Sequence, residues 1–303
     1  MTAKDFVSLA DVSRTDLWSY LERARQLKIE HKTGHGHDLL RNKTLAMIFQ
    51  KPSLRTRVSF ETGMTMLGGH AIYLAPSDIK LGERETTEDI ALVLSRYADG
   101  IMARVFGHEI VQDLAKYADI PVINGLSDRE HPCQVLGDLL TVWEHKRRVE
   151  GLTLAWVGDG NNVCHSWLQA GPRMGMNLSI ATPEGSEPDE AIVEYGRQWG
   201  PKVELTHDPQ AAVENADVIY TDVWASMGQE ALAGQKTHAF KGFRVHKQLL
   251  GQAKPDAVVM HCLPAHYDEE IAHEVAHGPQ SVIFDQAENR MHAQNGILTT
   301  LMT

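Results

Sequence analysis

The fold and the chemistry of this chain are decided by one stretch, Phe49-Gln50-Lys51-Pro52-Ser53-Leu54-Arg55-Thr56-Arg57. The apolar run that leads into it, residues 45–49, indicates a short buried strand. After the proline, a helical pattern runs from Ser53 to Leu67 and stops at two glycines. Arginines in a first helical turn oppose the helix dipole, so we expect an anion there, held by free backbone N–H groups and guanidinium groups. Phosphate is the anion that we expect there. A capped surface helix with solvated arginines is the alternative interpretation.

Composition limits the classes of protein to which the chain can belong. It has 303 residues, of which 43% are hydrophobic and 23% charged, as in ordinary globular proteins. The formal net charge of −11 argues against a nucleic-acid partner. The sequence contains neither the apolar stretch of a signal peptide nor a run of membrane length. We therefore expect a cytoplasmic protein with no membrane partner, in which Cys133, Cys164 and Cys262 are reduced.

Apolar strand-like runs alternate with helical patterns along the whole chain. The expected strands are residues 45–49, 70–74, 100–104 and 122–124 in a first series, and 153–157, 177–181, 202–206, 218–222, 257–261 and 282–285 in a second. Helical patterns lie between them, for example at 90–98, 133–144 and 209–216. This alternation predicts an α/β fold with parallel sheets flanked by helices. The two series predict two α/β domains that meet near residue 150.

Polar side chains stand at the ends of strands in the first half, where open α/β sheets bind ligands. Arg104 ends one expected strand, and the helix after the next strand opens with His131-Pro132-Cys133-Gln134. His131 and Gln134 are three residues apart, so they share one helix face. Together they can donate to a carbonyl oxygen and accept from an amide nitrogen. A proline-led helix start with a buried histidine explains the same residues equally well.

In the second half, the turn Gly158-Asp159-Gly160-Asn161-Asn162 resembles a dinucleotide-binding fingerprint but lacks its third glycine, which Val163 replaces. The two asparagines instead place amides where they can bind polar groups. Asp222 ends one expected strand and Cys262 follows another, while Arg290 lies in the last helix. A buried structural cysteine is the alternative for Cys262.

Four motifs, taken together and in this order, resemble the aspartate/ornithine carbamoyltransferase family, and within it the members that use ornithine. They are Ser53-Leu-Arg-Thr-Arg57, His131-Pro-Cys-Gln134, Asp222-Val-Trp-Ala-Ser226-Met-Gly228 and His261-Cys-Leu-Pro264. The resemblance implies a carbamoyl phosphate-binding domain over residues 1–150 and an ornithine-binding domain over 151–285, joined by interdomain helices. It also implies a C-terminal helix, 286–303, that packs back on the first domain, and a homotrimer or a multiple of trimers. The reaction that the resemblance implies, transfer of a carbamoyl group from carbamoyl phosphate to an amine, requires neither a metal nor an organic cofactor.

The resemblance also assigns roles to individual residues. The catalytic residues are Cys262, Arg104 and His131, with Cys262 positioning substrates and not acting as a covalent nucleophile. Carbamoyl phosphate is bound by Ser53, Leu54, Arg55, Thr56, Arg57, Lys80, Arg104, His131, Gln134, Cys262, Leu263 and Arg290. L-Ornithine is bound by Asn162, Asp222, Ser226 and Met227.

Two positions depart from the family pattern. Leu54 stands where relatives often have threonine, which removes a hydroxyl but leaves the backbone N–H groups. Lys80 stands where relatives commonly have glutamine or histidine, in a loop that in this family reaches the neighbouring subunit, and a solvated loop lysine is the alternative. Three alternative functions stay open from the sequence: a nicotinamide-dependent dehydrogenase, a non-catalytic amino-acid-binding protein, and a sister carbamoyltransferase that uses putrescine or an N-acylated ornithine.

Overall fold

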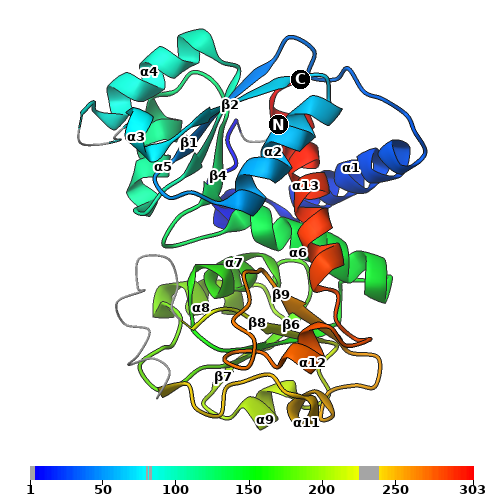
Figure 1. The fold of residues 1–303 in the computed structure, drawn as a ribbon. Coiled ribbons are helices and arrows are strands. Elements are labelled where there is room, and N and C mark those ends of the chain that lie inside the picture. The colour runs from blue at the N-terminus through cyan, green and yellow to red at the C-terminus, as the bar shows by residue number, and fades with distance from the viewer. Residues whose placement is uncertain (1–3, 80, 82–83, 225–238) are drawn as a thin grey trace. The chain divides into compact units, whose positions relative to one another are not determined.

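The chain forms two compact units. The structure, a computed structural model, describes residues 4–79, 81, 84–224 and 239–303. The first unit consists of Met1–Leu140 together with Glu288–Thr303, and the second consists of Thr141–Ala287 (Figure 1). Two helices, α6 (Pro132–Lys146) and α13 (Ile283–Leu301), begin in one unit and end in the other.

The first unit is built on a four-stranded parallel sheet with the strand order β2-β1-β3-β4. Its strands are β1 (Thr44–Phe49), β2 (His70–Leu74), β3 (Gly100–Arg104) and β4 (Val122–Leu126). The expected strands are confirmed here, with β1 one residue longer at its start and β4 two residues longer at its end.

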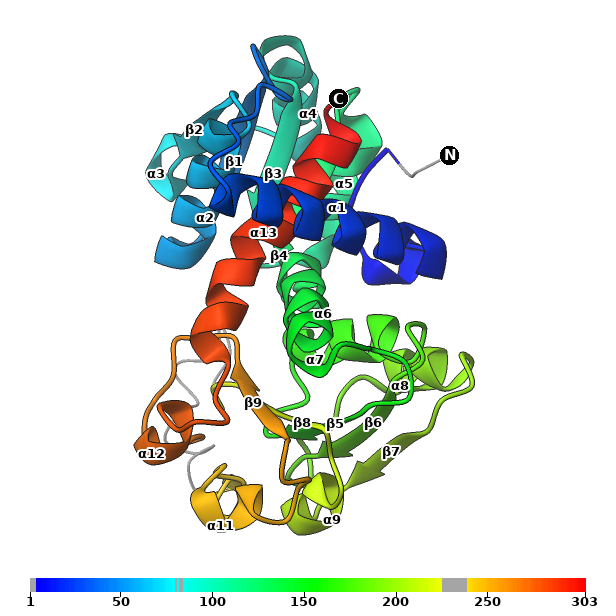
Figure 2. The ribbon, with the colours of Figure 1, turned by 90° about the vertical axis from the view of Figure 1, so that its right-hand side faces the viewer.

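Helices pack on this sheet and fill the core of the first unit. Apolar residues of α4 (Thr87–Tyr97) and α5 (His108–Tyr117) pack against Ile48, Ile101 and Val122 of the strands. The helices α1 (Arg14–Lys32) and α13 cross one another beside the sheet (Figure 2). At this crossing a Cβ on Gly296 would lie 2.7 Å from the Tyr20 carbonyl oxygen, so only glycine permits the close approach. The remaining elements are the 3-10 turn η1 (Leu9–Asp11), α2 (Leu54–Met66) and α3 (Pro76–Ile79).

The second unit is built on a five-stranded parallel sheet with the order β7-β6-β5-β8-β9. Its strands are β5 (Thr153–Val157), β6 (Asn177–Ala181), β7 (Val203–Thr206), β8 (Val218–Thr221) and β9 (Val258–His261). Its helices are α7 (Asn162–Ala170), α8 (Glu190–Arg197), α9 (Pro209–Val213), α11 (Lys247–Leu250) and α12 (His273–Ala276). The prediction of two α/β folds with parallel sheets is therefore confirmed.

One expected strand is wrong. Residues 282–285 do not form a strand, because α13 already begins at Ile283. Pairing with β9 is limited to one bridge, between Val259 and Ser281, after which Val282 N–H donates to the Val259 carbonyl at 3.0 Å. The apolar run from Val282 to Phe284 indicated a strand, but an apolar run this short fits a helical turn equally well.

In each sheet the order in which the chain adds strands reverses at one place, and the polar residues predicted for the site lie near that place. In the first sheet the chain leaves β1 for β2 on one side, while β3 pairs on the other side. In the second sheet the same reversal occurs between β5 and β8. Ligands of open α/β sheets bind at the carboxyl ends of the strands at such a reversal.

No helix among the described residues is both long enough and apolar enough to cross a bilayer.

Candidate active site

In the first unit, the reversal between β1 and β3 places the start of α2 beside Arg104. The parallel register sets Phe49 opposite Arg104, and Gln50 N–H donates to the Arg104 carbonyl at 2.9 Å. Ser53 is the N-cap of α2, and its hydroxyl accepts from Thr56 N–H at 3.4 Å. The first turn of α2 carries no acidic side chain. This is the helix start for which the sequence predicted an anion.

A buried histidine, His131, lies within electrostatic reach of three arginines from separate parts of the chain. Its pKa lies well below the ordinary value because burial disfavours the charged imidazole. The positive charges of Arg290, Arg104 and Arg55 lower this pKa further. His131 is therefore neutral at physiological pH, and a neutral imidazole offers one N–H donor without adding a fourth positive charge.

The last helix supplies one of these arginines. Arg290 is buried, and its Nη2 donates to Thr56 Oγ1 at 3.1 Å. Gly137 on α6 allows this placement, because a Cβ there would lie 3.1 Å from the Arg290 backbone nitrogen and Cα. A residue near the end of the chain is thus held against the first turn of α2.

The two arginines of α2 differ in their surroundings. Arg55 is partly buried and close enough to His131 to lower its pKa. Arg57 is exposed, its Nε donates to Glu61 Oε1 at 2.9 Å, and its guanidinium lies 4.0 Å from the centre of the Tyr73 ring. The partial burial of Arg55 and the contacts that engage Arg57 favour Arg55 as the main cation of this turn. Leu54 is 76% exposed, and its backbone N–H is the group that it can offer to an anion.

Gln134 is held in one orientation. Its Nε2 donates to Asp138 Oδ1 at 2.8 Å, one helical turn further along α6, and both residues are buried. The Gln134 Oε1 is buried and accepts no hydrogen bond from the residues that the structure describes. A buried acceptor without a partner is costly, so this oxygen suits the amide N–H of a ligand.

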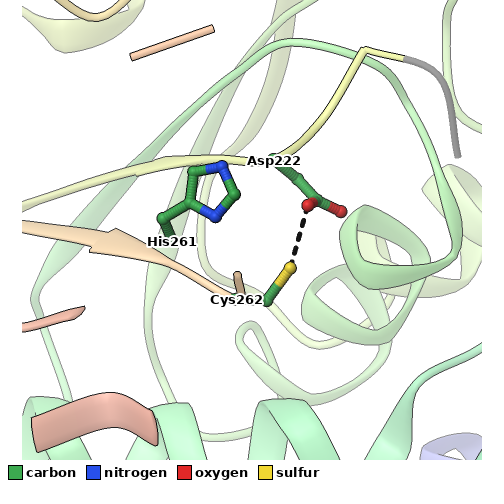
Figure 3. A group of neighbouring side chains, drawn as sticks. All are labelled: Asp222, His261 and Cys262. Atoms are coloured by element: carbon green, nitrogen blue, oxygen red, sulfur yellow. Dashed lines mark hydrogen bonds between the residues drawn. The ribbon is translucent and has the colours of Figure 1, made fainter. Parts of the chain in front are cut away.

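In the second unit, the reversal between β5 and β8 is bridged by hydrogen bonds to Asp222. Asn161 Nδ2 donates to Asp222 Oδ2 at 2.7 Å. The other carboxylate oxygen, Oδ1, accepts from Val223 N–H at 2.8 Å and from the Cys262 thiol at 2.9 Å. Figure 3 shows the Cys262 sulfur pointing at the carboxylate from the end of β9. Asp222 and the half-buried Cys262 thus form one hydrogen-bonded pair.

Asn161 also explains why the glycine turn is not a dinucleotide site. Its side-chain oxygen accepts from Val163 N–H at 2.9 Å and from Cys164 N–H at 3.1 Å. These are the N–H groups at a helix start that a pyrophosphate would need. The predicted ligand residue Asn162 is buried beside them as the first residue of α7.

The segment around Cys262 is fixed by a buried histidine. His261 Nδ1 accepts from Leu263 N–H at 2.9 Å, so its Nε2 carries the proton that faces Glu270 Oε1 at 3.1 Å. Glu270 Oε1 also accepts from His266 N–H at 2.6 Å. Asp222, His261 and Cys262 each offer a metal-ligand atom within 4.8 Å of the others. Both His261 nitrogens are already engaged, however, so a metal here would have to break this network.

The other two cysteines are buried thiols. Burial raises the pKa of Cys133 to about 12 and raises the pKa of Cys164 well above its ordinary value. The Cys133 thiol donates to the Asn124 carbonyl at 3.3 Å. Neither thiol suits a reaction that needs a thiolate. Among the predicted site residues, Lys80, Ser226 and Met227 lie outside the described part of the chain.

Asp138, Asn161 and Glu270 hold predicted site residues or their neighbours in place, and the sequence assigned no catalytic or ligand-binding role to them. Asn161 had a signal, because an asparagine between a glycine turn and a helix is a typical N-cap. Asp138 had a weaker one, because it lies four residues after Gln134 on the same helix. Glu270 is brought to His261 by the path of the chain after β9, which sequence spacing does not reveal.

The buried histidines of the first unit predict acid sensitivity. Burial lowers the pKa of His131, and it also lowers the pKa values of His108 and His292. In the unfolded chain histidines take up protons near pH 6.5, so below that pH the unfolded state binds more protons than the folded state. The free energy of unfolding should then fall by up to about 1.4 kcal/mol per pH unit for each such histidine.

We expect His131→Gln to reduce this loss, because glutamine takes up no proton. The measurement is the urea midpoint at about pH 7.5 and about pH 5.5, the range in which the linkage acts. His35→Gln, in an exposed loop after α1, is the matched control and should lose as much stability as the parent. An equal loss in His131→Gln and the parent would contradict the assignment.

The chain was compared with known proteins. Residues 4–144 match the carbamoyl-P binding domain of the aspartate/ornithine carbamoyltransferases, and residues 150–301 match their Asp/Orn binding domain. The anabolic ornithine carbamoyltransferase of Pyrococcus furiosus is 54% identical over 306 residues, which cover 100% of this chain and 97% of the relative.

Solved structures with a similar fold support the match to this family. The ornithine carbamoyltransferase of Pyrococcus furiosus has a TM-score of 0.96 at 54% identity, covering 98% of this chain and 96% of that one. The enzyme of Thermus thermophilus has a TM-score of 0.92 at 44% identity, with full coverage of both chains. Matches to both family domains, at this identity over the whole chain, show that the chain belongs to the aspartate/ornithine carbamoyltransferase family.

Proposed function

We propose that this chain transfers the carbamoyl group of carbamoyl phosphate to the δ-amine of L-ornithine, giving citrulline and phosphate. The observations that carry the proposal are the contact of Arg290 with the first turn of α2 and the neutral His131, whose pKa is lowered by the charges of Arg290, Arg104 and Arg55. Fixed positive charge at a helix start suits a phosphate, and the neutral imidazole beside it suits a carbonyl oxygen. The relatives named above are ornithine carbamoyltransferases, which supports ornithine as the acceptor.

The carbamoyl phosphate site belongs to the first unit. We assign the phosphate to Ser53, Thr56, Arg57 and the backbone N–H groups from Leu54 onward, with Arg55 and Arg290 as the principal cations. Thr56 Oγ1 accepts from Arg290 Nη2 at 3.1 Å and from Ser53 Oγ at 3.2 Å, so the Thr56 hydroxyl proton can be donated to the phosphate. The carbamoyl oxygen is assigned to His131 and Arg104, and the carbamoyl N–H to Gln134 Oε1, whose orientation Asp138 fixes.

The reaction is a direct transfer. The neutral δ-amine attacks the carbamoyl carbon, a tetrahedral centre forms, the bond from carbon to the phosphate oxygen breaks, and the amine proton leaves. A donor aimed at the developing oxyanion is typically worth about 3 kcal/mol, and His131, Arg104 and Thr56 are donors of this kind. The arginines stabilise the negative charge on the departing phosphate. No step requires a metal or an organic cofactor.

We assign the binding and deprotonation of the amine to residues of the second unit. A free δ-amine resembles that of lysine, with a pKa of about 10, so it arrives protonated. We assign Asp222 and Cys262 to steering this amine and to drawing its proton away, and Leu263 to contact with the carbamoyl group. Asn161 orients Asp222. The predicted ornithine contacts Asn162, Ser226 and Met227 remain part of the proposal.

The test of the substrate is a comparison of carbamoylation rates. With carbamoyl phosphate and no added metal, we expect L-ornithine to react faster than putrescine, N-acetylornithine or aspartate at matched concentrations. Citrulline formation and phosphate release, measured together, check the stoichiometry. Faster turnover of putrescine or of an acylated ornithine would show that the chain is a sister carbamoyltransferase.

The two arginines of α2 provide a matched pair of variants. Arg55→Ala should lower kcat/KM for carbamoyl phosphate by roughly tenfold to a hundredfold, because a charge-assisted contact is typically worth about 1.5–3 kcal/mol. Arg57→Ala should lower it less, since that guanidinium is engaged by Glu61 and Tyr73. Equal losses would assign the phosphate to both arginines, and wild-type kinetics in Arg55→Ala would refute the anion site.

We further propose that the chain assembles as a homotrimer or a multiple of trimers, in the cytoplasm. Exposed apolar side chains of the first unit support assembly. Leu54 and Val58 lie one turn apart on α2 and are 76% and 49% exposed, and Ile72 on the edge strand β2 is 44% exposed. An interface between subunits would remove such side chains from water. Lys80 would reach the phosphate site of the neighbouring subunit.

Mixed trimers test the shared site. Subunits that carry Arg55→Ala and subunits that carry Lys80→Ala should each be impaired alone. If Lys80 serves the neighbour, hybrid trimers contain some sites with neither change. Activity after subunit exchange should therefore exceed the weighted average of the parents. No recovery, with exchange confirmed by mass, would rule out a shared site that uses Lys80.

A further inference from the structure

Gln50 belongs to the stretch that joins β1 to α2, and none of the roles assigned above uses its side chain. It is the first residue after β1, and its backbone N–H donates to the Arg104 carbonyl at 2.9 Å. Its side-chain oxygen, Oε1, accepts from Phe106 N–H at 2.8 Å. Gln50 therefore holds the chain on both sides of Val105, directly after the end of β3.

These two hydrogen bonds follow the pattern of a parallel ladder. In such a ladder a residue donates to the residue before its partner, and its own carbonyl accepts from the residue after that partner. Phe49 pairs with Arg104, so the next partners are Gln50 and Val105. Gln50 N–H makes the first bond of this pair, and the side-chain oxygen of Gln50 makes the second in the place of a backbone carbonyl. The side chain thus extends the pairing of β1 and β3 by one residue.

The pairing on the opposite side of β3 is irregular at the same place. The register between β3 and β4 shifts just before Arg104, which pairs with Leu126, so that Gly125 is passed over. An extra residue of this kind disrupts the ladder locally and redirects the neighbouring side chains. The regular pairing that fixes the backbone of Arg104 therefore comes from the β1 side, through Gln50.

Arg104 is a residue whose placement matters for catalysis. It is assigned to the carbamoyl oxygen, and its charge acts on His131. A donor to a developing oxyanion must be held within about 0.5 Å of its productive position, and hydrogen bonds from neighbouring residues provide this precision. The orientation of the backbone from which the arginine side chain extends is the first requirement for such placement.

We infer that Gln50 is a positioning residue for Arg104. Its side-chain amide continues the pairing of β1 and β3 beyond the last backbone bond, and it holds the Arg104 backbone in the orientation that carbamoyl transfer needs. The inference rests on the proposed function. Gln50 acts through Arg104 and needs no contact of its own with the ligand, because its side-chain oxygen is engaged by Phe106 N–H.

The test begins with Gln50→Met, because methionine has a similar length and its thioether is only a weak acceptor. We expect kcat for carbamoyl transfer to fall about threefold to tenfold, the effect of one ordinary hydrogen bond, with a smaller change in KM for carbamoyl phosphate. Gln112→Met, at an exposed position of α5 in the same unit, is the matched control and should keep the kinetics of the parent. Parent-like kcat in Gln50→Met would overturn the inference, and a lowered urea midpoint beside it would assign Gln50 to stability alone.

A double-mutant cycle with Arg104→Ala shows whether Gln50 acts through that arginine. If it does, the variant that carries both Gln50→Met and Arg104→Ala should be no slower than Arg104→Ala alone. A further loss by the full factor of Gln50→Met would overturn the inference, because Gln50 would then act independently of Arg104. Parent-like kinetics in Arg104→Ala would refute the role of Arg104 in the proposed function, and this inference with it.

Discussion

In each unit the candidate site residues depend on one constraint, the reversal of strand order in a parallel sheet. At such a reversal the connections after two neighbouring strands lead away from each other, which leaves the strand ends open to a ligand. In the first sheet this opening lies between β1 and β3 and brings the start of α2 to Arg104. In the second it lies between β5 and β8, where Asn161 donates to Asp222. The polar residues therefore owe their proximity to backbone pairing that involves none of their side chains.

The second requirement is electrostatic. The charges of Arg290, Arg104 and Arg55 all act on one imidazole, in a chain whose formal net charge is −11. Positive charges that repel one another destabilise a site until an anion binds there. The arginines of the first unit therefore favour the anion-bound state. Keeping His131 neutral avoids adding to this repulsion. In the second unit the corresponding charged group is the Asp222 carboxylate, which accepts hydrogen bonds from an amide, a thiol and a backbone N–H.

The strands were predictable because each is a short apolar run bounded by turn residues, and the parallel sheets followed from the alternation. The family followed from four motifs, although no single one of them would have sufficed. What the sequence could not supply was register and side-chain direction. Nothing in the sequence Ser-Leu-Arg-Thr-Arg distinguishes Arg55, whose charge lowers the pKa of His131, from Arg57, which contacts Glu61 and Tyr73. The run at residues 282–285 was misassigned because strand and helix are indistinguishable over so few apolar residues.

The first unit is discontinuous in sequence, and this has a consequence for how the protein is made. Its last piece, Glu288–Thr303, follows the entire second unit along the chain. During synthesis on a ribosome, the second unit can therefore fold while the first still lacks its closing helix. Arg290 lies in that late segment, so a nascent chain has Arg55 and Arg104 long before it has Arg290. The three arginines can act together only after the whole second unit has been synthesised.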